Sequence, residues 1–148
     1  MQESKNIYDY PLLDYRTPEE GSEAHTGDLR YSIDWDCPEG TEIYAACTGT
    51  VVFVKDDSNE GGEKDEKYWY SGNRIVIEHE NGEYSAYEHL RYRGVVVRVG
   101  EKVVQGQLIG YSGNTGYGDG PHLHFEVFID PSEDRAEGKT VPVRFIGS

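Results

Sequence analysis

The chain lacks any apolar run that approaches the roughly 20 residues a membrane-spanning helix requires. Basic residues are scarce as well, because 14 Lys and Arg stand against 28 Asp and Glu, which gives a formal net charge of −14. So acidic a chain repels phosphate backbones, and we therefore expect no nucleic-acid partner. Helical periodicity of useful length is also missing, which leaves strands and turns as the building material.

Cysteine is nearly absent, with two among 148 residues. Cys37 and Cys47 flank a turn-forming segment at 38–41, so they are placed either to form a disulfide or to remain as two buried thiols. The sequence leaves both possibilities open. Their spacing is not that of a zinc ribbon, and there is no second cysteine pair to complete one.

Glycine and tyrosine are abundant instead, at 18 and 12 residues, and together with many Val, Ile and Thr they predict a β-rich protein with many turns. The length predicts one domain over residues 1–148, which we divide into an N-terminal extension (1–22), a core (23–130) and a C-terminal tail (131–148). Alternation and turn signals predict strands at 31–35, 42–46, 50–54, 73–79, 84–90, 106–111, 122–127 and 140–145.

Two segments between these strands predict loops. Residues 55–67 are charged, with Gly61-Gly62 at their centre, and end at the aromatic triplet Tyr68-Trp69-Tyr70. Such a triplet lines a substrate site in some proteins, but packing at the base of a loop is the interpretation we favour. Residues 112–120 are rich in glycine, yet no Lys-Ser/Thr follows and the next element is a strand, which excludes a P-loop.

Two of the five histidines stand one residue apart in His122-Leu123-His124. Side chains alternate along a strand, so both imidazoles point to one face while Leu123 points to the core. Two rings about 6.5 Å apart at their Cα atoms can address one metal ion, or one can bind the ion while the other handles a water molecule. Glu126 falls on the same face and is placed to orient a ring N–H.

A catalytic zinc site needs about three protein ligands, and two histidines with one carboxylate form one known set. His25, Asp34, His79 and His89 are the residues elsewhere in the chain that could join the His-x-His pair. Zinc lowers the pKa of a water molecule to about 7, and neighbouring histidines then serve as general base or stabilise a developing oxyanion.

Segments from Asp34 to Val127 resemble, in order, the zinc peptidases of family M23, also called lysostaphin- or LytM-type endopeptidases. They are Ile33-Asp34, Pro38-Glu39-Gly40-Thr41, Tyr44-Ala45-Ala46, Gly49-Thr50-Val51-Val52, Gly72-Asn73-Arg74-Ile75-Val76-Ile77-Glu78-His79, Tyr87-Glu88-His89-Leu90, Val99-Gly100-Glu101-Lys102-Val103, Gly106-Gln107-Leu108-Ile109-Gly110, Gly113-Asn114-Thr115-Gly116 and Gly120-Pro121-His122-Leu123-His124-Phe125-Glu126-Val127. The resemblance implies an all-β fold of antiparallel sheets, of the duplicated-hybrid or barrel-sandwich kind. It also implies one Zn²⁺ per chain and hydrolysis of peptide bonds in the cross-bridges or stem peptides of bacterial peptidoglycan.

The same resemblance assigns roles to single residues. Asp34 and His124 become metal ligands, His122 becomes the general base for the water that zinc activates, and His89 stabilises the oxyanion or shares the base role. The family's first motif is His-x-x-x-Asp, but the residue four places before Asp34 is Arg30, which cannot be a ligand. His25, followed by Thr-Gly, fits a variant with five inserted residues, and we assign it as the third metal ligand.

His79 matches a position without a catalytic role in the family, so we expect it to be structural. We expect a monomer that acts on peptidoglycan in the periplasm, the cell envelope or the extracellular space, although residues 1–6 lack the basic-then-apolar pattern of a signal peptide. A relative that binds peptidoglycan or activates another hydrolase without catalysis is the alternative function. A lipoyl-type carrier, suggested by residues 99–107, ranks last because Lys102 lies in the wrong segment and the histidines would be unexplained.

Overall fold

The computed structural model describes residues 3–13, 19–20, 30–118 and 120–147. These residues form strands and short 3₁₀ turns, without an α-helix among them. The turns are η2 (Glu66–Tyr68) and η3 (Glu80–Gly82). The all-β expectation is therefore confirmed, and no helix in the described part of the chain is long and apolar enough to cross a membrane.

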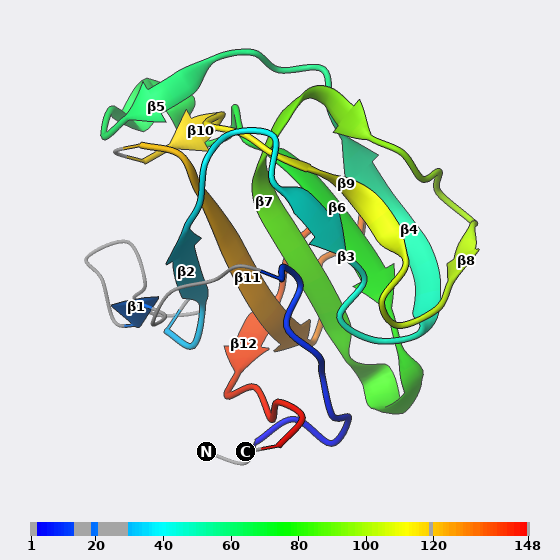
Figure 1. Cartoon of the computed structure of the whole chain (residues 1–148). Helices are drawn as coiled ribbons and strands as arrows, with labels where there is room; N and C mark the ends of the chain where they lie inside the picture. The colour runs from blue at the N-terminus through cyan, green and yellow to red at the C-terminus, as the bar shows by residue number, and fades with distance from the viewer. Residues whose placement is uncertain (1–2, 14–18, 21–29, 119, 148) are drawn as a thin grey trace.

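One large antiparallel sheet carries most of the strands (Figure 1). Its strands follow the order β1 (Glu19–Glu20), β2 (Ile33–Asp36), β11 (His122–Ile129), β7 (Tyr84–Val95), β6 (Asn73–Glu78), β4 (Gly49–Lys55) and β8 (Lys102–Val103). Three further strands join this path: β12 (Lys139–Val141) pairs with β11, and β9 (Leu108–Ser112) pairs with both β7 and β3 (Glu42–Tyr44). The two longest strands of the sheet, β7 and β11, lie side by side at its centre.

Apolar side chains of these central strands form much of the core. Leu123, Phe125 and Val127 of β11 are fully buried, as the alternation along this strand predicts. Trp35 of β2 lies against Phe125, with ring centroids 5.9 Å apart, and Tyr87 of β7 lies against it at 5.3 Å. One face of β11 is thus held rigidly, which leaves the other face to carry polar side chains.

The segments 3–13 and 139–147 lie side by side near one end of the sheet (Figure 1). The backbone N–H of Ser4 donates to the carbonyl of Pro142, and Tyr8 forms an isolated parallel bridge with Phe145. Glu83 is buried and accepts hydrogen bonds from the backbone N–H groups of Lys5 and Asn6 and from the Tyr8 hydroxyl. The division at residues 22 and 130 stays a prediction.

The expected hairpin between β6 and β7 forms, with Asn81 at φ 64° and Gly82 at φ 68°. Both residues therefore adopt the left-handed conformation that makes Asn-Gly so favourable in hairpin connections. The connection spans a 3₁₀ turn, so that Glu78 pairs with Tyr84. This register decides which side chains of β6 and β7 face one another farther along.

The charged segment 55–67, expected as a loop, contains the short strand β5 (Gly61–Glu63), which pairs in parallel with β10 (Gly116–Tyr117). A Cβ on Gly61 would lie 2.2 Å from the backbone nitrogen of Gly116, so only glycine allows this approach. The tail strand is shorter than expected, at Lys139–Val141. The two cysteines are free thiols, which answers the question that the sequence left open.

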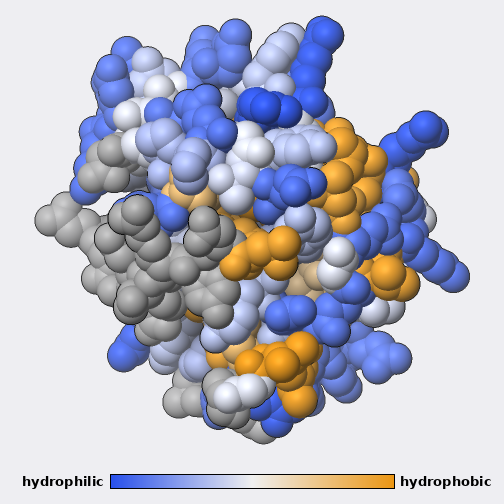
Figure 2. All heavy atoms as spheres, in the orientation of Figure 1, coloured by the Kyte–Doolittle hydropathy of each residue, from blue (hydrophilic) through white to orange (hydrophobic). Residues whose placement is uncertain are grey.

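The surface in Figure 2 is mostly hydrophilic, with separate apolar patches rather than one continuous apolar face. This agrees with the acidic composition and a charge of −14.

Candidate metal and catalytic site

Four polar residues form a row across four neighbouring strands. In the register of the sheet, Asp34 of β2 lies opposite His124 of β11, His124 lies opposite Glu88 of β7, and Glu88 lies opposite Arg74 of β6. Directly opposed residues in antiparallel strands are about 4.5–5.5 Å apart at Cα or Cβ, so their side chains meet. The fold therefore places an acid, an imidazole, a second acid and a guanidinium in sequence along one face.

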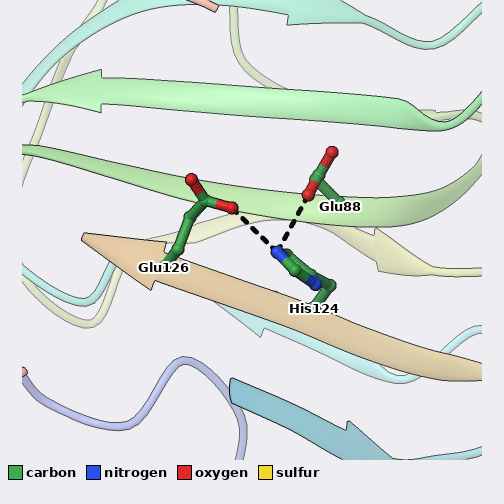
Figure 3. Close-up of side chains that lie close together, drawn as sticks. All are labelled: Glu88, His124 and Glu126. Carbon is green, nitrogen blue, oxygen red and sulfur yellow. Dashed lines mark hydrogen bonds and ion pairs between the residues drawn. The ribbon is translucent and has the colours of Figure 1, made fainter. Parts of the chain in front are cut away.

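His124 sits in the middle of this row, and both of its ring nitrogens have carboxylate neighbours. Nδ1 lies 3.1 Å from Asp34 Oδ1, while Nε2 lies 2.8 Å from Glu126 Oε1 and 3.1 Å from Glu88 Oε2. Figure 3 shows the Nε2 atom held between the two glutamates, one from each strand. A carboxylate only accepts, so Nε2 carries a proton and donates it, and Nδ1 faces Asp34. The prediction that Glu126 orients a ring N–H of this pair is confirmed.

His122 shares the face of His124, as the alternation predicts. Its Nε2 lies 3.8 Å from the same Asp34 oxygen, Oδ1. Its Nδ1 lies 2.8 Å from the carbonyl oxygen of Gly120, which only accepts. Nδ1 of His122 therefore donates to this carbonyl, which leaves the lone pair of Nε2 directed at the site.

His89 reaches this face through a β-bulge. Asn73 pairs with Leu90 and Arg74 pairs with Glu88, so His89 is the extra residue of β7 and has no partner in the ladder. Its backbone is left-handed, with φ 66°. Neighbours on a regular strand point to opposite faces, whereas bulges re-aim a side chain next to functional sites. His89 and Glu88 consequently both point at the His122–His124 pair, with 4.3 Å between the ring centroids of His89 and His122.

The glycine-rich connection between β9 and β11, which includes β10, holds His89 in place. The Thr115 carbonyl oxygen accepts a hydrogen bond from His89 Nδ1 at 2.6 Å, which directs the lone pair of Nε2 into the site. Gly116 has φ 84°, and a Cβ there would lie 2.7 Å from the Cα of Gly72. A Cβ on Gly118 would lie 2.9 Å from the His122 ring. The glycines of this loop thus let the backbone close tightly around two imidazoles.

The surroundings shift the pKa values of the imidazoles in opposite directions. Burial lowers the pKa of His89 to about 4, and the neighbouring His122 acts in the same direction. Burial also lowers the pKa of His124, but the charge of Glu88 and the hydrogen bonds with Asp34 and Glu126 outweigh it and raise that pKa well above its ordinary value. His89 is therefore a neutral base at neutral pH, whereas the surroundings of His124 stabilise a positive charge on its ring.

Sequence reasoning missed the role of Arg74 and Glu88 in this face. The buried guanidinium of Arg74 makes an ion pair with Glu88 and lies 3.6 Å from Glu126 Oε2. Burial raises the pKa of the Glu88 carboxyl, but Arg74 and then His124 overcome this and lower it to about 2. An arginine inside an apolar strand opposite a glutamate would have been the signal, had the strand register been known.

A second group of potential ligand atoms comes from Glu88, His124 and Glu126, which lie within 4.8 Å of one another. The guanidinium of Arg74 already contacts this group, and one cation disfavours another at the same place. Nδ1 and Asp34 lie on the other side of the His124 ring, away from this guanidinium.

The two remaining histidines, His25 and His79, have different outcomes. His25 lies outside the described residues, so its assignment as a ligand stays a prediction. His79 is buried at the far end of β6, where Nδ1 lies 2.7 Å from the Thr48 carbonyl and Nε2 lies 2.7 Å from the Ser85 hydroxyl. Its expected structural role is confirmed.

A cavity of about 340 Å³ opens beside the row, with His89, His124, Glu88 and Arg74 among its lining residues. Trp69, Tyr70 and Tyr117 line it too. The interpretation of the aromatic triplet as loop-base packing is wrong for Tyr70, which is 84% exposed. Trp69 makes an edge-to-face contact with Tyr117 at 5.1 Å, so the wall joins the aromatic triplet 68–70 to the 112–120 segment.

The left-handed backbone of His89 leads to a prediction about the free energy of unfolding. A non-glycine residue in this conformation costs about 1–2 kcal/mol, whereas glycine adopts it freely. Both His89→Gly and His89→Ala remove the same ring contacts, so we expect the glycine variant to have the higher free energy of unfolding, by about 1 kcal/mol. Urea unfolding of the two variants measures the difference, and an alanine variant that equals or exceeds the glycine variant would show that the bulge is not strained.

The chain was compared with known protein families and with curated proteins. Residues 28–139 match Peptidase family M23. Peptidoglycan DD-endopeptidase ShyA of Vibrio cholerae is 36% identical over 110 residues, which cover 74% of this chain and 23% of that protein. The chain thus spans less than a quarter of the length of this relative and of ShyC from the same organism.

Solved structures agree with the sequence comparison. A zinc-containing peptidase from Vibrio cholerae superimposes with a TM-score of 0.62 at 28% identity, over 84% of this chain and 37% of that one. The catalytic domain of lysostaphin from Staphylococcus simulans superimposes with a TM-score of 0.58 at 29% identity, over 93% of this chain and 87% of that domain. By sequence and by fold, the chain belongs to peptidase family M23.

Proposed function

We propose that this chain is a zinc-dependent endopeptidase that hydrolyses peptide bonds in bacterial peptidoglycan, in the cell envelope or outside the cell. One observation carries the proposal. In a chain of family M23, Asp34 Oδ1 lies 3.1 Å from His124 Nδ1 and 3.8 Å from His122 Nε2. The names of two relatives, a peptidoglycan DD-endopeptidase and a zinc-containing peptidase, support peptidoglycan as the substrate and zinc as the metal.

Asp34 Oδ1 and His124 Nδ1 would hold the zinc ion, with His25 as the third ligand. A tetrahedral zinc site with bonds of about 2.0–2.2 Å holds its donor atoms about 3.3–3.5 Å apart, close to the 3.1 Å between these two atoms. The charges fit as well. Asp34, Glu88 and Glu126 bring three negative charges and Arg74 one positive charge, so a divalent cation makes the group neutral.

A zinc ion at this position supplies a Lewis acid for the peptide carbonyl and lowers the pKa of a water molecule. The unprotonated Nε2 of His122 is placed to accept the proton of that water as it attacks the carbonyl carbon. The resulting imidazolium then returns the proton to the amide nitrogen when the C–N bond breaks. The Gly120 carbonyl accepts from Nδ1–H before and after this transfer, so the proton is gained and lost at Nε2.

His89 has the same tautomer as His122 and likewise directs its Nε2 lone pair into the site, because the Thr115 carbonyl binds its Nδ1–H. Its pKa of about 4 keeps Nε2 unprotonated at neutral pH, so it accepts a hydrogen bond from the attacking water rather than donating one to an oxyanion. Of the two roles that the family resemblance allows, we therefore assign His89 the shared base role. The cavity that His89 and His124 line, with its aromatic wall, would hold the substrate peptide.

Metal binding should depend on pH in a defined direction. The metal-free protein keeps His124 protonated because its pKa is raised well above the ordinary value, and a metal must displace that proton from Nδ1. Below this pKa, the zinc affinity should fall by about tenfold for each unit of pH decrease. Competition with a chelator of known affinity between pH 5 and 8 measures the slope, and an affinity independent of pH would contradict ligation by His124.

The substrate is tested with purified peptidoglycans that differ in their cross-bridges. The zinc-loaded chain is incubated with each, and the released fragments are identified by mass spectrometry. We expect new amino and carboxyl ends at one kind of peptide bond and no cleavage of the glycan strands. An Asp34→Asn chain serves as the control, and a zinc-loaded chain that releases no peptide fragment from any of them would overturn the proposal.

A further inference from the structure

The Nε2 side of His124 is closed by a ring of charged groups. Arg74 Nη1 contacts Glu88 Oε1, and Arg74 Nη2 lies 3.6 Å from Glu126 Oε2. The other oxygen of each carboxylate faces His124 Nε2, at 3.1 Å for Glu88 Oε2 and 2.8 Å for Glu126 Oε1. Each glutamate thus uses one oxygen for the guanidinium and one for the imidazole, as Figure 3 shows for the imidazole side.

Burial makes this arrangement dependent on the arginine. Glu126 is fully buried and Arg74 is 9% exposed. Two carboxylates that face one N–H repel each other, and a buried charge without a partner is strongly unfavourable. The planar guanidinium reaches both acids at once, with Nη1 on Glu88 and Nη2 3.6 Å from Glu126, which a lysine ammonium cannot do with the same geometry.

We propose that Arg74 and Glu88 are positioning residues, which clamp His124 so that Nε2–H points inward and Nδ1 points at Asp34 and the metal. Partners of this kind fix the tautomer and the orientation of a metal-binding imidazole. Arg74 has a second effect, because its cation occupies the carboxylate side of the ring and so directs the metal to the Asp34 side. The inference rests on the metal site of the proposed function.

The structure offers one competing interpretation, in which Glu88 and Glu126 are themselves metal ligands together with His124. The two interpretations predict opposite effects for the loss of Arg74. If Arg74 positions His124, an Arg74→Met chain binds zinc more weakly. If the glutamates are ligands, the same change releases two carboxylates from their ion pairs, and zinc binds more tightly.

The test measures zinc affinity by competition with a chromophoric chelator, alongside the melting temperature of the metal-free chain. For Arg74→Met and for Glu88→Gln we expect affinity to fall by about 10–100-fold, the usual cost of losing a partner of a metal-binding histidine. Arg74→Lys should recover part of the loss. If Arg74→Met fails to fold, the double variant Arg74→Met/Glu88→Gln removes both charges of the ion pair and takes its place. Nitrogen-15 NMR of the His124 ring in the zinc-loaded chain reports whether Nε2 keeps its proton.

Glu83→Gln is the matched control, because Glu83 is another buried glutamate whose partners, Lys5, Asn6 and Tyr8, lie in the N-terminal segment. This variant should lower the melting temperature and leave zinc affinity unchanged. Unaltered affinity and an unaltered His124 tautomer in both Arg74→Met and Glu88→Gln would overturn the positioning role, as would tighter binding by Arg74→Met. A wild-type chain that binds no zinc would instead overturn the proposed function itself.

Discussion

Replacement of His122 by alanine is expected to lower the rate of peptide-bond hydrolysis by a factor of about 10²–10⁴, the usual contribution of a general base. The reason is geometric. His122 directs the lone pair of Nε2 at the site because Gly120 binds its Nδ1–H, and Nε2 lies 3.8 Å from the Asp34 oxygen. The rate of release of peptide fragments from peptidoglycan, followed by mass spectrometry at saturating zinc, measures the loss.

The same variant should keep its zinc, since His122 is placed as a base and not as a ligand. Metal analysis of the purified variant therefore separates the two roles. A His122→Ala chain that loses its zinc together with its activity would show that this residue is a ligand. A variant with undiminished activity would leave His89, whose ring has the same tautomer, as the base.

Loss of a metal ligand is the second large effect. Changes to partners that only orient a ligand weaken metal binding by about 10–100-fold, so removal of a ligand itself should cost more than about 100-fold. We expect this for Asp34→Asn, His124→Ala and His25→Ala, measured by chelator competition. Asp36→Asn is the matched control, because Asp36 is an exposed acid two residues from Asp34 on the same strand.

His25 is the informative member of this set. The match to family M23 begins at residue 28, after His25, and the residue at the family's usual position is Arg30. If His25→Ala retains full zinc affinity and activity, the five-residue insertion is misread and the third ligand lies elsewhere. If its affinity falls as far as that of Asp34→Asn, the insertion loops out and leaves the ligand set whole.

Much of the fold follows from local pattern. The alternation in His122–Val127 was enough to place two imidazoles and Glu126 on one face and three apolar side chains in the core, and the structure confirms this division. Asn81-Gly82 was enough to predict the hairpin between β6 and β7. Family resemblance, rather than pattern, linked Asp34 to His124, and these residues do lie opposite each other.

Strand register set the limit of what could be predicted. A two-residue Asn-Gly connection would pair Glu80 with Glu83 and, six residues along each strand, Arg74 with His89. The actual connection pairs Arg74 with Glu88, and a shift by one residue reverses every side chain of a strand. The ion pair at the back of His124 was therefore invisible in the sequence.

The bulge at His89 was hidden for a related reason. Regular alternation puts Glu88 and His89 on opposite faces, so no periodic pattern places both beside His124. The extra residue and its left-handed backbone are fixed by the tertiary setting. The Thr115 carbonyl binds the His89 ring, the Thr115 hydroxyl donates to the Leu90 carbonyl, and the Gly113 N–H donates to the His89 carbonyl. Bulges are over-represented next to active sites, where they re-aim a side chain.

Zinc content and its link to hydrolysis test the central claim most directly. Protein purified without chelator should contain one zinc per chain and release peptides from peptidoglycan. Removal of the zinc should stop this release, and one added equivalent should restore it. Well under half an equivalent of zinc with none taken up on titration, or peptide release that survives removal of the metal, would contradict a hydrolytic metal centre built on Asp34 and His124.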